Sequence, residues 1–306
     1  MACCEEKPVL ELQHGSLCKS HFLNYFEERV FKTMNKFQMI LPEDRLCVAV
    51  SGGKDSLTVL YLTQKYLQKH HLTLPLFALA VDEGIADYRE HTLQDLQRFC
   101  TEHHVPLTVV SFQEELGRTL DEAYPVINKD TKKKPCNICG VWRRYLLNKH
   151  AQKLGATKVI TGHNLDDEAQ AIVMNWFKAN TDLAARLGPV SGIREHHLFV
   201  QRVKPLYLSP EKEVRLYAFL KGFQIQFAEC PYSQSGYRHD IQEMLNAFEN
   251  KYRGTKQGLV NSFLSLLPLL KENSEDAPVG RCSVCSGAAT QETCNACRMK
   301  EMLHAV

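Results

Sequence analysis

A short run of small and charged residues carries the clearest chemical signal in this 306-residue sequence. Residues 51–56 read SGGKDS, and they stand between an apolar run at 46–50 and a helix-like run at 57–67. Glycines let backbone N–H groups turn toward an anion, and a helix N-terminus adds the positive end of its dipole. We therefore expect nucleotide phosphates to be bound by Ser51, Gly52, Gly53, Lys54, Asp55 and Ser56.

The spacing of this run excludes two common phosphate-binding loops. A Walker loop reads G-x-x-x-x-G-K-[ST], and a dinucleotide loop reads G-x-G-x-x-G; neither string occurs around Lys54. The alternative is an ordinary turn between strand and helix with a chance pair of glycines. The strand, turn and helix signals agree with one another around the motif, which favours the phosphate site.

Four of the twelve cysteines form a paired CxxC unit near the C-terminus. Each CxxC places two sulfurs on one tight turn, and two such turns close a tetrahedral site. Disulfides are the alternative, but they are rare in the reducing cytosol. The spacing therefore predicts a structural Zn²⁺ site formed by Cys282, Cys285, Cys294 and Cys297.

A second cysteine group lies near the N-terminus and matches a zinc site less completely. Cys18 and His21 form a half-site at the start of an amphipathic helix expected over 22–38. The other half is expected from the adjacent pair Cys3 and Cys4, with His14 as a rival ligand. The alternative is a degenerate finger without its metal.

The central cysteines Cys136, Cys139 and Cys230 have the most distinctive chemistry. Three thiolates are too few for a closed structural zinc site, but they suit a [4Fe–4S] cluster with one iron left open. They also suit a thiol pair that carries a persulfide, and a purely structural CxxC is the remaining alternative. The preceding lysines, 132–134, are either a solvated loop or a contact to a phosphate backbone. Cys47 and Cys100 stand alone in apolar settings and are expected to be buried.

Composition bounds the class of protein. Apolar residues make up 44% and charged residues 24%, as in a globular protein with its own core. The net charge of +2 gives no global basic signature, so contact with nucleic acid must come from local patches. No apolar run approaches the ~20 residues of a membrane span, and the N-terminus lacks a signal-peptide pattern. We expect a cytoplasmic protein with no membrane contact.

The elements that must position these residues alternate along the chain. Apolar runs at 46–50, 76–81, 107–110 and 158–161 are separated by helical patterns at 57–67, 92–103 and 141–154. This alternation predicts an α/β fold with a doubly wound parallel sheet. Ligands bind at the carboxyl ends of such strands. Asp82, Gly162 and His163 each follow a predicted strand and should meet the SGGKDS loop there.

The remaining pattern divides the chain into four parts. Residues 1–38 hold the N-terminal cysteines and the first helix, and 39–232 hold the catalytic domain. Residues 233–275 form a helical extension, in which a helix starting near Arg238 and His239 could contact RNA phosphates. Residues 276–306 hold the C-terminal Cys4 finger. Helices are also expected from 210 to about 221, at 241–252 and at 259–270, with a short strand at 223–227.

Four motifs in order carry a resemblance to a known family. They are SGGKDS at 51–56, CNICG followed by RR at 136–144, TGHNLDDEAQ at 161–170, and ECPY at 229–232. The loop resembles that of the N-type ATP pyrophosphatases, whose fold is the adenine nucleotide alpha hydrolase type. Together the motifs resemble the tRNA 2-thiouridine synthetases, which include TtuA and the cytosolic wobble-uridine thiolases. The tRNA 2-thiocytidine synthetases share the loop and central cysteines but differ at the termini.

The resemblance implies a reaction, its cofactors and its partners. ATP would adenylate the C2 oxygen of a tRNA uridine at position 54 or 34, and sulfur would then replace that oxygen. Asp167 would lie near ATP and Mg²⁺, and Gly162 and His163 would line the nucleotide pocket. Cys136, Cys139 and Cys230 would ligate the cluster, with Cys136 or Cys230 as persulfide carrier in the alternative route. The sulfur donor would be free sulfide or a ubiquitin-like carrier protein, and the enzyme would be a homodimer.

Readings from other classes remain open at this point. Thiolation of an anticodon-loop cytidine uses the same loop and cysteines. ATP-dependent amidation, as in NAD or GMP synthetases, uses the loop but needs no cysteine cluster. A zinc-finger RNA-binding protein with an inactive nucleotide domain would not need Lys54, Asp55 and Asp167 together with all three central cysteines.

Overall fold

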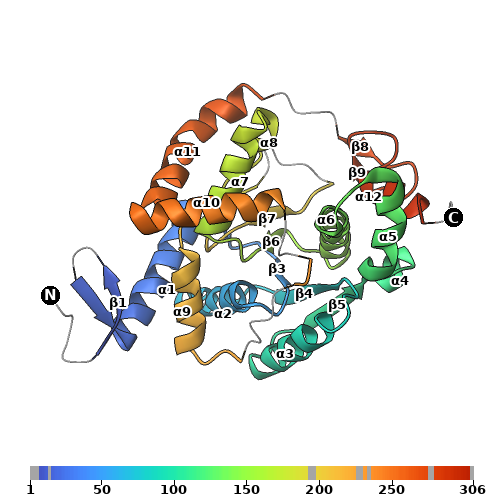
Figure 1. The fold of residues 1–306 in the computed structure, drawn as a ribbon. Helices are drawn as coiled ribbons and strands as arrows, with labels where there is room; N and C mark the ends of the chain where they lie inside the picture. Colours follow the sequence, from blue (N-terminus) through green and yellow to red (C-terminus); the bar gives the residue numbers. More distant parts are fainter. Residues whose placement is uncertain are drawn as a thin grey trace.

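A five-stranded parallel sheet forms the centre of the computed structural model (Figure 1). The structure describes residues 7–12, 15–191, 198–224, 230–232, 236–274 and 279–303. Every pairing between neighbouring strands of this sheet is parallel. The strand order is β5-β4-β3-β6-β7, with β3 (Leu46–Val50), β4 (Leu76–Asp82), β5 (Leu107–Ser111), β6 (Lys158–Ile160) and β7 (Gln201–Val203). The order reverses between β3 and β6, where open α/β sheets bind their ligands.

Helices cover both faces of the sheet, so the predicted doubly wound α/β fold is confirmed. Val48 and Val50 of β3 belong to one apolar core, and Cys47 of the same strand belongs to the opposite core, as the alternation of a strand requires. The first core is covered by α1 (Lys19–Lys36), α2 (Lys54–Lys69), α3 (Arg89–Glu102) and α9 (Glu211–Leu220). The second is covered by α4 (Phe112–Leu116), α5 (Leu120–Thr131), α6 (Pro135–Lys153) and α12 (Asn295–Glu301).

A further group of helices packs around its own apolar cluster next to the sheet. Phe263 and Tyr207 are fully buried in this cluster, and Ile241 is nearly so. The helices are α7 (Leu165–Phe177), α8 (Thr181–Ala185), α10 (Tyr237–Lys251) and α11 (Thr255–Glu272). Because α10 packs against α7, the late helical segment returns to the edge of the nucleotide-binding motifs.

Small two-stranded sheets stand near the two ends of the chain. One pairs β1 (Pro8–Leu12) with β2 (Gly15–Cys18) in front of α1, and the other pairs β8 (Gly280–Arg281) with β9 (Ala288–Ala289) in front of α12. Figure 1 shows them on opposite sides of the molecule. Among the described helices, none is long and apolar enough to span a lipid bilayer.

Several expected elements differ from the structure at their limits. The helix expected from residue 141 begins at Pro135, which occupies a first-turn position that suits proline. Cys136 and Cys139 therefore lie within α6 and not before it. Phe223 and Gln224 are not in a strand, and 225–227 lie outside the described residues. Cys47 and Cys100 are buried, as expected. The four-part division of the chain stays a prediction.

Candidate active site

The SGGKDS loop joins β3 to α2 at the carboxyl edge of the sheet. Gly53 caps α2, so the loop opens onto the positive end of that helix. The Ser56 hydroxyl donates to the carbonyl of Gly53 at 2.9 Å and accepts from the backbone N–H of Ser51 at 3.1 Å. These bonds hold the loop in one shape without a ligand, which lowers the entropic cost of binding a phosphate.

Two glycines at this loop have no room for a side chain. Gly52 has a φ of +85°, and a Cβ added there would lie 2.4 Å from the carbonyl oxygen of Thr92. A Cβ on Gly162, which follows β6, would lie 2.8 Å from the carbonyl carbon of Asp55. The loop is therefore pressed between α3 and the segment after β6, as expected from motifs that follow neighbouring strands.

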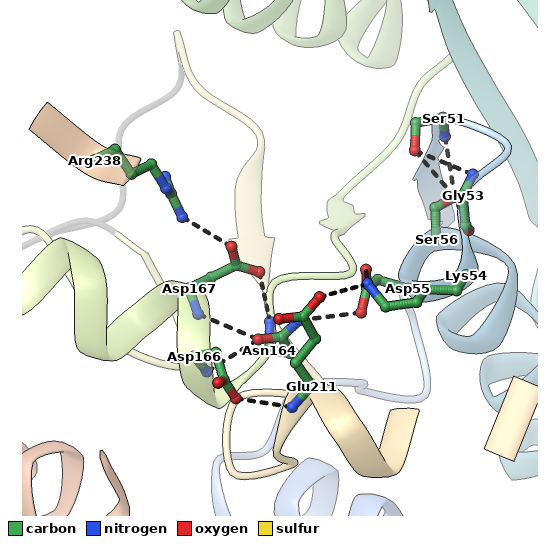
Figure 2. Close-up of polar contacts among 10 residues, drawn as sticks. All are labelled: Ser51, Gly53, Lys54, Asp55, Ser56, Asn164, Asp166, Asp167, Glu211 and Arg238. Carbon is green, nitrogen blue, oxygen red and sulfur yellow. Dashed lines mark hydrogen bonds and ion pairs between the residues drawn. The ribbon is translucent and has the colours of Figure 1, made fainter. Parts of the chain in front are cut away.

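Lys54 lies between two carboxylates in the structure. Its Nζ is 2.9 Å from Asp55 Oδ2 and 2.8 Å from Glu211 Oε1 (Figure 2). Burial opposes the charged form of Lys54, but the two carboxylates outweigh it and raise its pKa. Lys54 is therefore a full positive charge at neutral pH, available to a phosphate that displaces either carboxylate.

Asn164 connects the SGGKDS loop to the first turn of α7. Its amide donates to Asp55 Oδ1 at 3.0 Å, and its side-chain oxygen caps α7 by accepting from the N–H groups of Asp166 and Asp167. The Asn164 backbone N–H in turn donates to Asp167 Oδ2 at 3.2 Å. This capping box fixes Asp167 at the same edge of the sheet as the SGGKDS loop. Figure 2 shows the start of α7 facing that loop.

The outer oxygen of Asp167 is paired with an arginine from α10. Arg238 Nη2 lies 2.8 Å from Asp167 Oδ1, and Arg238 Nε donates to Gln170 Oε1 at 2.8 Å. Burial raises the pKa of Asp167 to about 6, with Arg238 acting against it. Since the Asp167 side chain is still 32% exposed, the carboxylate can be reached by a ligand.

A buried ion-pair chain joins the phosphate loop to the cysteine helix α6. Arg89 is 3% exposed and donates to the carbonyls of Ser51 and Val81, each at 2.6 Å. Its Nε lies 3.0 Å from Glu83 Oε2, and the other oxygen of Glu83 lies 3.3 Å from Arg143 Nη1. Arg143 belongs to α6, one turn after Cys139. The carboxyl ends of β3 and β4 are thereby connected to the helix that carries two of the three central cysteines.

The three central cysteines lie in one neighbourhood beside this chain. Cys136 is exposed and donates its thiol hydrogen to the Tyr232 carbonyl at 3.2 Å, which draws α6 to the segment that holds Cys230. Burial raises the pKa of Cys139 to about 12, and Arg143 acts against this. The other two thiols also raise the pKa of Cys139, which reflects their proximity. Three thiols in one neighbourhood are a donor set that suits a [4Fe–4S] cluster with one iron left open, and their role as its ligands stays a prediction.

Positive side chains gather around His163, which follows Gly162. Burial and then the charges of Lys204, Arg238, Arg202 and Arg143 lower the pKa of His163. Because the His163 ring is partly exposed to solvent, repulsion by the four cations favours the neutral imidazole more than burial does. Lys204 and Arg143 are balanced by Glu168 and Glu83, whereas Arg144 and Arg202 form no ion pair among the described residues. The region is thus suited to a polyanion.

Asp82 ends β4 and turns toward its own loop. Its Oδ1 accepts from the Gly84 N–H at 2.9 Å. The same residue lines a hollow of about 560 Å³ beside α3, together with Ile85, Arg89 and Val109. A volume of this size falls within the range of small-molecule sites. The expected role of Asp82 in nucleotide binding stays a prediction.

The four C-terminal cysteines form a ligand group for a metal. The sulfurs of Cys282, Cys285, Cys294 and Cys297 all lie within 4.8 Å of one another. The backbone N–H of Cys294 donates to Cys282 Sγ at 3.2 Å, a bond that favours the thiolate. The donor set fits Zn²⁺.

At the N-terminus, the structure describes half of the expected zinc site. Cys18 Sγ lies 3.1 Å from His21 Nδ1. Cys3, Cys4 and His14 lie outside the described residues. The N-terminal zinc site therefore stays a prediction.

The sequence alone did not single out Arg89, Glu83 or Glu211. Arg238 was expected only at the start of a helix that could contact RNA phosphates, and Gln170 only as the last residue of the TGHNLDDEAQ motif. Glu211 reads locally as an acidic residue in the first turn of a helix, which is common for dipole reasons alone. Arg89 opens α3 and has no local motif. Only the sheet order, which brings segments far apart in the chain to one edge, reveals their roles.

Comparison with known proteins agrees with this geometry. A PP-loop domain model matches residues 24–238. The tRNA-5-methyluridine(54) 2-sulfurtransferase of Pyrococcus horikoshii is 33% identical over 96% of this chain and 91% of its own. Cytoplasmic tRNA 2-thiolation protein 1 of Aspergillus niger is 32% identical over 94% and 83%.

A solved structure extends the likeness to three dimensions. The U34-tRNA thiolase NcsA from Methanococcus maripaludis, determined with its [4Fe-4S] cluster, has a TM-score of 0.82 and 31% identity, covering 98% of this chain and 95% of that one. Both the sequence and the arrangement of the whole chain match, which confirms the predicted resemblance. The chain belongs to the PP-loop family of tRNA 2-thiolation enzymes.

Proposed function

We propose that this protein is an ATP-dependent tRNA uridine 2-sulfurtransferase that acts in the cytoplasm. The observation that best supports the proposal is the chain of contacts from Ser51 through Arg89 and Glu83 to Arg143, which connects the SGGKDS loop to the helix that carries Cys136 and Cys139. An enzyme that only activates a carbonyl needs the first site. An enzyme that then replaces oxygen by sulfur needs both.

Activation of the base falls to the SGGKDS loop. The uracil C2 oxygen attacks the α-phosphate of ATP, the bond to pyrophosphate breaks, and an O-adenylated base remains. Negative charge grows on the departing pyrophosphate, and Lys54, the loop N–H groups and the α2 dipole stabilise it. The oxygen donors Asp167 and Asp55 suit Mg²⁺, which would neutralise phosphate charge.

Sulfur delivery falls to Cys136, Cys139 and Cys230. These thiolates would hold a [4Fe–4S] cluster, which supplies an open iron on which a sulfide can be presented. Sulfide attacks C2 and AMP leaves with the former C2 oxygen, so the step needs no oxidant or reductant. Arg143 lies beside Cys139 and offers a fixed positive charge on the path between the two sites.

Several finer features belong to the proposal. The uridine is that of the T loop or the wobble position, the sulfur donor is free sulfide or a ubiquitin-like carrier protein, and the enzyme works as a homodimer. The four C-terminal cysteines bind Zn²⁺ as a structural site.

Mass spectrometry of tRNA nucleosides tests the function. The protein is reconstituted anaerobically with iron and sulfide and given ATP, Mg²⁺, sulfide and a tRNA transcript with uridine at positions 34 and 54. We expect 2-thiouridine and one AMP per product, and fragment mapping assigns the position. The variant Cys136→Ser should keep ATP binding and lose the product. Formation of 2-thiocytidine or of no thiolated base would contradict the proposal, and equal activity of metal-free protein would show that sulfide reaches C2 without a cluster.

A further inference from the structure

Arg238 occupies a position between the nucleotide site and the surface of the protein. It lies in the first turn of α10, and its side chain is 50% exposed. Its guanidinium makes two contacts to α7, one through Nη2 to Asp167 and one through Nε to Gln170, each at 2.8 Å (Figure 2 shows the first). The two contacts differ in kind: Gln170 is neutral, whereas Asp167 is a carboxylate at the nucleotide site.

The contact to Asp167 conflicts with the binding of a nucleotide. Asp167 is fixed by Asn164, which also holds Asp55 of the SGGKDS loop, so its carboxylate faces the space expected for ATP and Mg²⁺. A carboxylate that serves a divalent cation attracts a guanidinium less, and the two cations repel each other. The bond from Nε to Gln170 is not affected by this competition. Nucleotide binding should therefore loosen one end of Arg238 while the other stays anchored.

Several cations stand near Arg238; Lys204 and Arg143 are balanced by carboxylates, whereas Arg202 forms no ion pair among the described residues. Arg202, Lys204 and Arg143 act on the same neighbouring ring, His163, as Arg238 does. Lys134, before the cysteine helix, has its Nζ 3.6 Å from the place where a Cβ on Gly236 would stand, just before α10. A loosened guanidinium in such a field is best satisfied by an anion from outside the chain, and a phosphate accepts two parallel bonds from it.

We propose that ATP·Mg²⁺ releases Arg238 from Asp167 and that the freed guanidinium binds a phosphate of the tRNA backbone. The inference rests on the proposed function, and it adds an order to it: the charged nucleotide site strengthens tRNA binding. Because binding free energies are reciprocal, bound tRNA must strengthen ATP binding by the same factor. In the absence of nucleotide, Asp167 withholds Arg238 from the RNA.

Measurement of tRNA affinity with and without nucleotide tests this coupling. The probe is an unmodified tRNA transcript, and the nucleotide is the α,β-methylene analogue of ATP with Mg²⁺, which is not cleaved. We expect the analogue to tighten tRNA binding about 5-fold to 20-fold, within the usual range of coupling between two sites. It should also steepen the plot of log affinity against log salt by about one, as one added phosphate contact predicts.

Two variants at the pair give opposite signs. Asp167→Asn removes the competitor, so tRNA binding without nucleotide should rise to the level of the loaded wild-type protein. Arg238→Gln removes the contact, so tRNA binding should stay at the unloaded level whether or not nucleotide is present. Arg253→Gln is the matched control: it removes a charge of the same type from the exposed turn that follows α10. Any loss of affinity it causes should be equal in both nucleotide states.

Three results would overturn the inference. The first is that the analogue and Mg²⁺ leave the tRNA affinity and the salt slope of the wild-type protein unchanged. The second is that Asp167→Asn, shown to be folded by circular dichroism, binds tRNA no more tightly than the wild-type protein in the absence of nucleotide. The third is that Arg238→Gln weakens binding of the analogue but keeps the full coupling to tRNA, which would place Arg238 on the nucleotide phosphates. Each result leaves formation of 2-thiouridine by the wild-type protein untouched. Failure of the proposed function would instead appear as absence of that product.

Discussion

Removal of the Glu83 carboxylate should be among the most damaging single changes near the site. The carboxylate is 5% exposed and lies between Arg89, whose side chain is 4% exposed, and Arg143, whose side chain is 48% exposed. In Glu83→Ala, the guanidinium of Arg89 keeps its bonds to the Ser51 and Val81 carbonyls but loses the only carboxylate with which it is paired among the described residues. A buried charge without its counter-charge is costly because the protein interior solvates it poorly.

The structure sets the size of this effect on each side of Glu83. Breaking a buried pair by removing one partner typically costs about 3–5 kcal/mol, and the two carbonyls place Arg89 at the lower end. A loss of about 3 kcal/mol lowers the melting temperature of a domain of this size by roughly 6–12 °C. Arg143→Ala removes a half-exposed guanidinium and leaves Glu83 paired with Arg89, so it should cost only about 0–1 kcal/mol. Removal of Glu83 should therefore destabilise the protein far more than removal of Arg143, although both changes break a contact of the same carboxylate.

Thermal unfolding of the three proteins measures both numbers, and isothermal titration of ATP reports on the loop. Glu83→Ala should also weaken ATP binding, because Arg89 holds the Ser51 carbonyl. The double variant Glu83→Ala/Arg89→Met should recover part of the melting temperature without recovering ATP affinity. The reasoning is refuted if Glu83→Ala unfolds within about 3 °C of wild type, or if Arg143→Ala is equally destabilising.

Further outcomes follow from other contacts. Gly162→Ala should lower the free energy of unfolding by about 1–3 kcal/mol and weaken ATP binding, because the new Cβ meets backbone atoms of Asp55 that cannot rotate away. Gly258→Ala, at an exposed position of α11, should instead raise the free energy of unfolding, by about 1 kcal/mol at most. Equal melting temperatures of the two variants would contradict this reasoning. The lowered pKa of His163 predicts a neutral imidazole from pH 8 to about pH 5.5 in NMR titrations of the folded protein, whereas the same residue in the urea-unfolded chain should titrate near pH 6.5. Because the unfolded chain then binds a proton that the folded protein does not, the folded protein loses stability as the pH falls below 6.5. A midpoint near 6.5 in the folded protein would contradict the effect of the neighbouring cations. Cys294→Ser should lower bound zinc by one ion per chain in elemental analysis, and Cys100→Ala should not; unchanged zinc in Cys294→Ser would rule out that site.

Local signals made the centre of the fold predictable. β3 has the limits expected from its apolar run, and α2 begins within the SGGKDS motif because a glycine turn and a helix start stand next to each other there. β7 has three residues, too few for a periodic signal, and α5 contains an internal proline, which normally argues against a helix; both went unpredicted. α7 was quoted only as a motif, although Asn164 and Asp167 form a capping box that marks a helix start.

The site was predictable as a set of motifs but not as a network. Lys54 and Glu211 are 157 residues apart, and Arg238 and Asp167 are 71 apart. Nothing in the sequence around either partner specifies such a pair, because an exposed helix commonly carries single charges without any long-range role. Motifs that follow strands could be placed together by the topology of a parallel sheet. The charged residues that pair with these motifs, such as Glu211 and Arg238, could not be placed from the sequence.

The C-terminal cysteine group packs on α6, so the proposed zinc site and the proposed cluster site share one helix. Trp142 is fully buried, and its indole N–H donates to the carbonyl of Ala296, which lies between the ligands Cys294 and Cys297. Trp142 stands on the same helix as Cys136 and Cys139. Under the proposed function, loss of zinc from the C-terminal cysteines would disturb the positions of Cys136 and Cys139 through this helix, so zinc depletion should lower thiolation more than ATP binding.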